Sequence, residues 1–161
     1  MGDRKGLILS LCLALVATPA CTAFLVQTRE PGESNKTMPE AVAAEYHCDK
    51  RPLPFFEIEK SELFPLRAKP GQKLAHRIVY VMCPKRPTEV IAGSLETRIR
   101  FKGRSILRDR IEQELKPGRW VIDTFIPLPE QAEPGVYALE VEFASKHGDL
   151  EEHSDFLVEE P

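Results

Sequence analysis

Residues 94–102 read SLETRIRFK, and apolar and charged side chains alternate along this stretch. Leu95, Ile99 and Phe101 recur at every second or fourth position, as they would on one face of a β-strand. Thr97 shares their face, and the charged Glu96, Arg98, Arg100 and Lys102 would lie on the opposite face. This period of two predicts an antiparallel strand with one buried face and one solvent-exposed face.

The same period appears in other short segments, most clearly in residues 137–143, which read YALEVEF. Turn residues rich in proline and glycine separate these segments from one another. Segments of this length and spacing are typical of a β-sandwich. We therefore predict seven strands, over residues 55–64, 73–82, 94–102, 105–115, 119–126, 136–143 and 153–159.

Length and composition agree with a single all-β domain. The chain has 161 residues, which leaves room for one domain of ordinary size and a short appendage. Hydrophobic residues make up 42% of it, enough for a core, and 14 prolines against 9 glycines favour many turns over long helices.

One segment resembles a known structural motif. Glu133-Pro134-Gly135-Val136-Tyr137 is similar to the Pro-Gly-x-Tyr corner that precedes the sixth strand of many immunoglobulin-like and fibronectin type III domains. The resemblance implies a seven-stranded antiparallel immunoglobulin-like sandwich over residues 47–161. It also implies that the hydroxyl of Tyr137 bonds back to the backbone, although a plain core tyrosine is the alternative.

The same resemblance has limits. Trp120 begins the predicted fifth strand and does not lie on the third. No cysteine pair would link the second and sixth strands. The domain is therefore not of the antibody type.

The N-terminus has the features of an export signal. Arg4 and Lys5 precede an apolar segment over residues 7–16, as in secretory signal peptides. The residues Thr18-Pro19-Ala20-Cys21 then resemble the lipobox of bacterial lipoproteins. That resemblance implies removal of the signal peptide, residues 1–20, and lipidation of Cys21.

Two other interpretations of the N-terminus stay open. The chain could be cleaved after Ala20 or Ala23 without lipid, or residues 7–26 could remain as an uncleaved anchor, since about 20 apolar residues span a bilayer. All three interpretations export the remainder, which would face the periplasm or the cell surface. The polar composition of residues 21–46 predicts a flexible tether, with room for a turn or two of helix over residues 39–46.

The cysteines favour lipidation and a disulfide. Cys12 lies in the apolar segment, which leaves Cys21, Cys48 and Cys83, an odd number for an oxidising compartment. Acylation of Cys21 leaves Cys48 and Cys83 to pair. If the first and second strands pair antiparallel, the start of one lies beside the end of the other and the two sulfurs come within bridging range. Two unpaired buried thiols are the alternative.

No arrangement of residues reaches a catalytic motif. The chain has no Gly-x-Ser-x-Gly elbow and no glycine-rich phosphate loop. The four histidines, His47, His76, His147 and His153, lack the compact spacing of structural zinc sites. We therefore expect no enzymatic activity, no metal and no cofactor. A net charge of −3 argues against binding to nucleic acid.

Basic residues gather on one predicted hairpin and form the candidate binding patch. These residues are Arg98, Arg100, Lys102, Arg104, Arg108 and Arg110. Such a patch would suit an acidic polysaccharide, lipid headgroup or protein. Alternatively, Arg98 and Arg100 would face Glu140 and Glu142 as cross-strand ion pairs, since the third and sixth strands are neighbours in an immunoglobulin-like sheet.

These observations lead to one main hypothesis. The chain would be a non-enzymatic envelope lipoprotein, held to the membrane by its lipid, whose sandwich binds an envelope protein or polysaccharide or acts as an accessory subunit. One alternative is a periplasmic chaperone-like protein that acts through a sheet edge. Another is a metal or redox accessory protein built on Cys48, Cys83 and His47.

Overall fold

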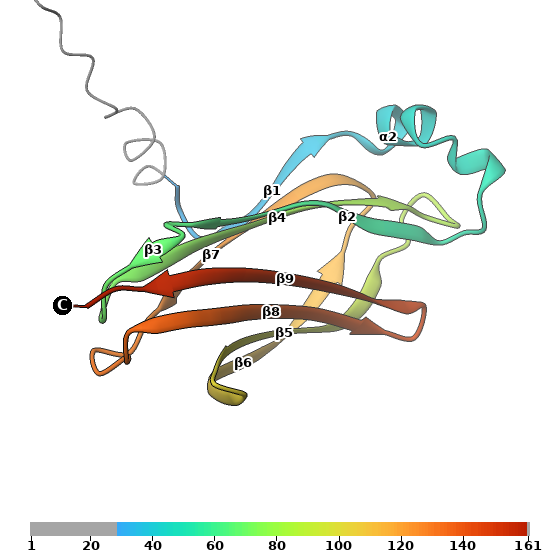
Figure 1. The fold of residues 1–161 in the computed structure, drawn as a ribbon. Coiled ribbons are helices and arrows are strands. Elements are labelled where there is room, and N and C mark those ends of the chain that lie inside the picture. Colours follow the sequence, from blue (N-terminus) through green and yellow to red (C-terminus); the bar gives the residue numbers. More distant parts are fainter. Residues whose placement is uncertain (1–28, 161) are drawn as a thin grey trace, which may run out of the picture.

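The computed structural model describes residues 29–160, which fold into two β-sheets that face each other (Figure 1). The four-stranded sheet has the order β1-β7-β4-β2, with bounds Gly32–Thr37, Gly118–Pro127, Lys73–Cys83 and Phe55–Phe64. The five-stranded sheet has the order β3-β9-β8-β5-β6, with bounds Arg67–Ala68, Gly148–Val158, Gly135–Ser145, Ile91–Phe101 and Arg104–Leu115. The predicted all-β class is therefore confirmed as a sandwich.

All seven predicted segments are strands in the structure. Strand β2 has the predicted bounds, and β9 begins at Gly148, five residues before the predicted start at 153. Its first residues are polar, and their pairing with β8 extends the strand where their own pattern does not. Two strands, β1 and β3, were not predicted from the sequence.

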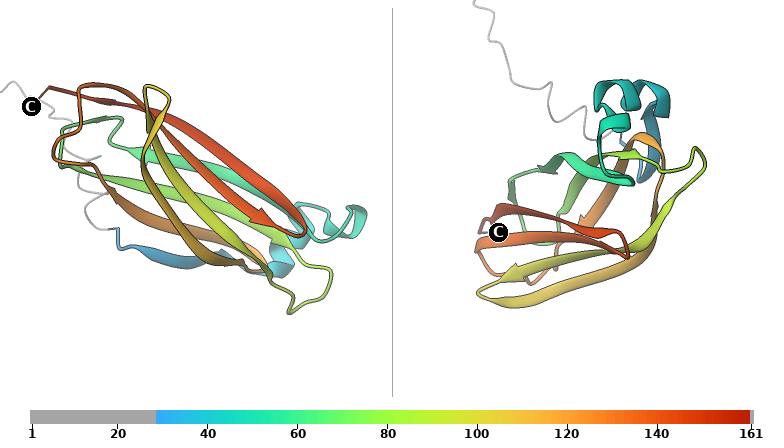
Figure 2. Two further views of the ribbon diagram at one scale, coloured as in Figure 1. Left: turned by 90° about the horizontal axis from the view of Figure 1, so that it is seen from below. Right: turned by 90° about the vertical axis from the view of Figure 1, so that its right-hand side faces the viewer.

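The main core lies between the sheets (Figure 2). Alternate residues of the central strands supply it, and Tyr80, Ile99 and Leu139 are at most 1% exposed. The ring of Tyr137 stacks on Phe101 at a centroid distance of 4.2 Å and on Phe156 at 5.5 Å. Aromatic and branched side chains thus fill the space between the two sheets.

A second, smaller core lies on the outer face of the four-stranded sheet. Helix α2, Pro39–Glu45, covers this face, and its Val42 is fully buried against Val81 and Cys83. Pro39 begins the helix, where its missing N–H costs nothing. The short η1, Cys48–Lys50, follows the helix and returns the chain to the sheet.

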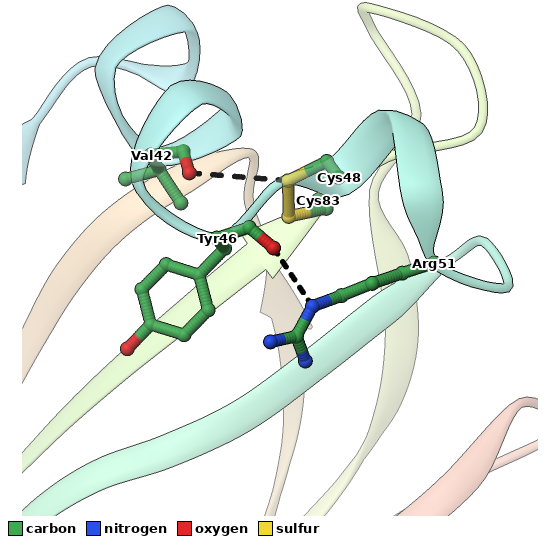
Figure 3. Close-up of a disulfide and its surroundings, with 5 residues drawn as sticks. All are labelled: Val42, Tyr46, Cys48, Arg51 and Cys83. Atoms are coloured by element: carbon green, nitrogen blue, oxygen red, sulfur yellow. Dashed lines mark hydrogen bonds between the residues drawn. A yellow bond between two sulfur atoms is a disulfide. The ribbon is translucent and has the colours of Figure 1, made fainter.

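The predicted disulfide between Cys48 and Cys83 is confirmed (Figure 3). The two Cα atoms are 5.9 Å apart, and β2 runs antiparallel to β4 with Phe55 opposite Cys83. The start of β2 therefore lies beside the end of β4, which was the premise of the prediction. Both half-cystines are buried.

The flexible tether predicted over residues 21–46 is wrong for residues 32–37, which form β1, whereas the short helix allowed over residues 39–46 is present as α2. Strand β1 pairs antiparallel with β7, from Gly32 opposite Asp123 onward. The side chain of Glu33 accepts a hydrogen bond of 2.7 Å from the Tyr80 hydroxyl and forms an ion pair with Lys116. The polar sequence of β1 folds because the edge of β7 offers backbone partners. The folded domain thus begins well before residue 47.

Other predictions concern residues outside the described part of the chain. They are the signal peptide over residues 1–20, the tether before residue 29 and the lipidation of Cys21. Within residues 29–160, neither helix has the length and apolar composition that crossing a bilayer requires.

Candidate binding surface

The predicted basic residues lie on one β-hairpin. Strands β5 and β6 pair antiparallel and are joined by Lys102 and Gly103, whose φ angles of 49° and 77° suit a tight two-residue turn. The hairpin forms one edge of the five-stranded sheet, and its outer face looks away from the core. The register places Arg98, Arg100, Arg108 and Arg110 on this outer face and Lys102 in the turn, whereas Arg104 lies opposite the core residue Phe101.

The centre of this surface is neutralised by acidic residues. Arg98 donates to Glu142 at 3.0 Å, and its Nε lies 3.4 Å from Glu96 and from Glu140. Arg100 lies 3.2 Å from Glu140. These are the cross-strand pairs expected if β5 and β8 are neighbours, and they leave little free positive charge at the centre.

Two arginines of β6 cover polar groups of β5. Arg108 donates two hydrogen bonds to Glu96, at 2.8 and 2.9 Å, and Arg110 donates to the hydroxyl of Ser94 at 2.8 Å. Ser94 and Glu96 are buried although they lie on the outer face. The bonds from Arg108 hold the pKa of Glu96 below its ordinary value. Two of the six predicted basic residues thus help to hold the sheet together.

At the turn of the hairpin the surface is hollowed and includes apolar side chains. A hollow of about 270 Å³ lies there, lined by Arg100, Lys102, Val136, Ala138 and Asp155 among others. We call it the turn-end hollow. Val136 is 64% exposed, more than any other large apolar side chain of the described residues. Lys102 also bonds to Glu133 at 2.9 Å.

Another exposed aliphatic residue, Leu66, lies beyond β9 and outside the lining of the turn-end hollow. Val136 lies opposite Leu157 in the β8–β9 ladder, and the N–H of Leu157 donates to the carbonyl of Leu66 at 2.8 Å. Leu66 is 57% exposed. The hollow itself therefore combines the exposed Val136 with Arg100 and Lys102, which are paired with Glu140 and Glu133.

Tyr137 holds the loop that positions this hollow. Its hydroxyl donates to the backbone carbonyl of Glu133 at 2.7 Å, the kind of bond that the resemblance to the Pro-Gly-x-Tyr corner implied. Burial raises the pKa of this hydroxyl. The ring is fixed in the core, so the neighbouring Val136 is held outward at a defined place.

A second cavity, which the sequence did not predict, opens between the two sheets. It measures about 340 Å³ and lies between β5 and β6 on one side and the end of β7 on the other. Its lining includes Leu95, Leu107, Ile111, Thr124 and Ile126. The alternating pattern predicts which side chains face inward, but it carries no information on how far the sheets diverge at an edge.

The histidines do not form a site in the described part of the chain. His76 lies inside the sandwich, 3% exposed, with its Nε2 3.0 Å from the hydroxyl of Ser61. Burial lowers its pKa to about 4. Within residues 29–160, no three His, Cys, Asp or Glu residues gather closely enough to hold a metal ion.

Comparisons with known proteins support the type of fold and give no information on function. No protein-family model and no curated protein matches the chain. Among solved structures, it is similar to Spo0M, a sporulation control protein from Bacillus subtilis, with a TM-score of 0.50 and 14% identity over 65% of this chain. The match spans 49% of that protein's length. A likeness at this identity shows a shared β-sandwich fold alone.

A second solved structure is less similar. It is a family 123 glycoside hydrolase from Clostridium perfringens, with a TM-score of 0.45 and 13% identity. The match covers 59% of this chain and 22% of the hydrolase. We draw no argument from it.

Proposed function

We propose that this chain is an exported, membrane-anchored lipoprotein whose immunoglobulin-like sandwich is a non-enzymatic binding or accessory module for another component of the cell envelope. The observation that carries the proposal is the turn-end hollow. Val136 is exposed there beside Arg100 and Lys102. Exposed apolar surface with a polar rim is typical of interaction sites.

The strand order supports the immunoglobulin-like part of the proposal. Apart from β1 and β3, the first, second and fifth strands (β2, β4 and β7) share one sheet. The third, sixth and seventh strands (β5, β8 and β9) share the other. Immunoglobulin-like domains divide these six strands in the same way, but the fourth strand, β6, lies beside β5 here, whereas a constant-type immunoglobulin domain has its fourth strand in the first sheet.

The chemistry of the hollow indicates the kind of partner. Arg100 and Lys102 are each paired with one acidic residue, and their remaining donors would meet a carboxylate or another anionic group, with Val136 in contact with apolar groups beside it. An acidic segment of an envelope protein fits this combination, and an anionic polysaccharide fits its charged part. Nucleic acid is a poor partner because the chain is acidic overall.

The experiment that tests the binding role compares two matched variants. Val136→Asp places a charge in the hollow, whereas Val90→Asp makes the same change at another exposed valine, 41% exposed, which immediately precedes β5 at the end of the strand away from the hairpin turn. The full chain and both variants are used to capture partners from envelopes of the producing cells. We expect Val136→Asp to lose a partner that Val90→Asp retains. Equal capture by both variants would contradict the proposed surface.

The anchor is tested separately. A Cys21→Ala variant should leave the membrane fraction or remain at its unprocessed size, because it has no thiol to acylate. Fractionation and mass spectrometry of the mature N-terminus provide the measurement. A Cys21→Ala variant that is fully processed and still membrane-bound would exclude the lipid anchor.

A chaperone-like role is the second candidate. The edge of β6 supports it, since an extended segment of a client could add to an unpaired strand. In that case client binding would be lost on Ile111→Asp in β6 and kept on Val136→Asp. The redox alternative has less support, because the Cys48–Cys83 bridge is buried beneath α2.

A further inference from the structure

Strand β6 presents a long sheet edge that no element of the described chain covers. It is the last strand of its sheet, it has 12 residues, and β5 is its paired neighbour. Figure 2 shows the β5–β6 hairpin at the margin of the molecule. A free edge of this length carries unpaired backbone N–H and C=O groups, which another strand can satisfy.

The sequence of β6 has an unusual symmetry. Residues 107–115 read LRDRIEQEL. Arg108 and Arg110 precede the central Ile111, and Glu112 and Glu114 follow it at the same spacings. When this segment is laid antiparallel against a copy of itself, each arginine meets a glutamate.

We propose that β6 is a self-association surface, through which two copies of this chain pair edge to edge about a twofold axis at Ile111. Arg110 of each copy then lies opposite Glu112 of the other, and Arg108 lies opposite Glu114. The symmetry makes each pair occur twice. The two five-stranded sheets join into one continuous sheet.

The groups that this pairing needs are available. Glu112 and Glu114 are exposed, and no basic side chain of residues 29–160 lies within ion-pair distance of either. Arg110 makes one hydrogen bond, to Ser94, which leaves its other donors free. Arg108 is bound to Glu96 through two N–H groups, yet its side chain is 62% exposed and its other donors are free to bind a second carboxylate.

The inward-facing side chains of β6 match in the same register. Ile111, which is 46% exposed, lies opposite its own copy. Leu107 lies opposite Leu115 of the second copy. Asp109 lies opposite Gln113, whose amide can donate to the carboxylate. Apolar residues thus meet apolar residues, and polar residues meet polar residues.

Neighbouring registers do not have this match. A twofold axis at Arg110 would place this arginine against its own copy. An axis at Glu112 would place Glu112 against itself and Arg108 against Lys116. Like charges directly opposite each other on paired strands are destabilising. Charge therefore selects the axis at Ile111.

The first experiment measures distance. In the proposed dimer the two Ile111 positions face each other across paired strands, with Cα atoms about 4.5–5.5 Å apart, which is within disulfide range. The full-chain Ile111→Cys variant should form a disulfide-linked dimer on mild oxidation. Ile106→Cys is the control, because residue 106 is a similarly exposed isoleucine of β6 whose two copies would be about 33 Å apart. Equal cross-linking of both variants would overturn the proposal.

The second experiment tests the charge pairs. Arg110→Glu places two glutamates against each other twice per dimer, and should weaken dimerisation by about tenfold or more. The double variant Arg110→Glu/Glu112→Arg exchanges the charges and should restore dimerisation. Sedimentation of the full chain in detergent gives the dimer dissociation constant. A monomeric wild type, or a double variant as weak as the single one, would overturn the proposal.

The dimer and the binding role can fail independently. Val136→Asp alters the turn-end hollow on β8 and should leave the sedimentation of the full chain unchanged. Circular dichroism and the intact Cys48–Cys83 bridge show that each variant is folded.

Discussion

His76 shows how a polar side chain can be tolerated in the core of this sandwich. It lies on β4 with Ser61 of β2 and Thr124 of β7 beside it, and it is 3% exposed. The hydroxyl of Ser61 satisfies one ring nitrogen. Burial disfavours the charged imidazolium, and the more distant Asp123 only partly opposes this effect.

This histidine should make stability depend on pH. Its folded pKa of about 4 lies below the ordinary value of 6.5, so between these values the unfolded chain binds a proton that the native chain does not. Neutral His76 makes its full contribution to the free energy of unfolding above pH 6.5. As the pH falls toward 4 this contribution is lost, and the free energy of unfolding decreases by at most about 1.4 kcal/mol per pH unit. Urea denaturation at several pH values should show this slope. The slope should decrease in His76→Gln, while His153→Gln, at an exposed position, should keep it.

Arg119 connects three elements on the outer face of the four-stranded sheet. It donates to both oxygens of Glu59 at 2.6 Å and to Glu45 of α2 at 2.8 Å. Glu59 also accepts a bond of 2.5 Å from Tyr46, and burial together with this carboxylate raises the pKa of Tyr46 to about 12. The guanidinium fork is therefore the link between α2 and strands β2 and β7.

Removal of that link should be costly. Arg119→Ala leaves a partly buried Glu59 without its cation and should lower the free energy of unfolding by about 1–3 kcal/mol. Arg119→Lys should recover only part of the loss, because lysine keeps the positive charge but its ammonium group cannot make the bidentate contact. Arg67→Ala is the control, because the Arg67–Glu159 pair is exposed and such pairs contribute about 0–1 kcal/mol. Equal losses in Arg119→Ala and Arg67→Ala, measured by denaturation, would contradict the role of Arg119.

At the scale of the element, the covalent link between η1 and β4 holds the N-terminal segments to the sheet. Cys48 and Cys83 are 35 residues apart in the sequence. Reduction should lower the free energy of unfolding by about 3–4 kcal/mol, because the open loop gains conformational entropy in the unfolded chain. The β-signal in circular dichroism should remain, since the main core does not contain the bridge. A Cys48→Ala/Cys83→Ala variant should be insensitive to the reductant.

Elements with their own alternating pattern were predicted well, and elements that depend on a neighbour were not. Residues 94–102 and 137–143 alternate over most of their length, and both segments lie in strands. Strand β1, with the sequence GESNKT, has no such pattern and becomes a strand because β7 has a free edge. The two-residue β3 is likewise defined by its parallel pairing with β9.

The candidate site was predicted only in part, for a related reason. The sequence predicted six basic residues on one hairpin. It also allowed the alternative that Arg98 and Arg100 form ion pairs with Glu140 and Glu142, and the structure shows these pairs. It did not single out Val136 as exposed. The alternation continues through Tyr137, and only the three-dimensional end of the sheet shows that the outer side of Val136 is uncovered. An apolar residue on the charged face of a strand is the signal that could have found it.

At the scale of the whole molecule, the corrected domain boundary has a measurable effect. A chain shortened to begin at residue 47 lacks β1 and α2, which exposes Val81 and the edge of β7. The loss of Val42 alone removes a side chain whose burial contributes about 1.5–3 kcal/mol. We expect this shortened chain to unfold at lower urea concentration and to aggregate, as monitored by denaturation and light scattering. A chain that begins at residue 29 should retain full stability.

The pairing of β1 with β7 should make the resistance of the domain to a pulling force depend on the direction of that force. It runs antiparallel to β7, and its Gly32 end points toward the end of the sandwich where β9 stops (Figure 1). A pull on Gly32 along the strand axis loads the hydrogen bonds of the β1–β7 ladder together, in shear. A pull across the axis loads them one after another, as in peeling. The domain should therefore resist tension best along its strands, and single-molecule extension from residue 29 would measure the difference.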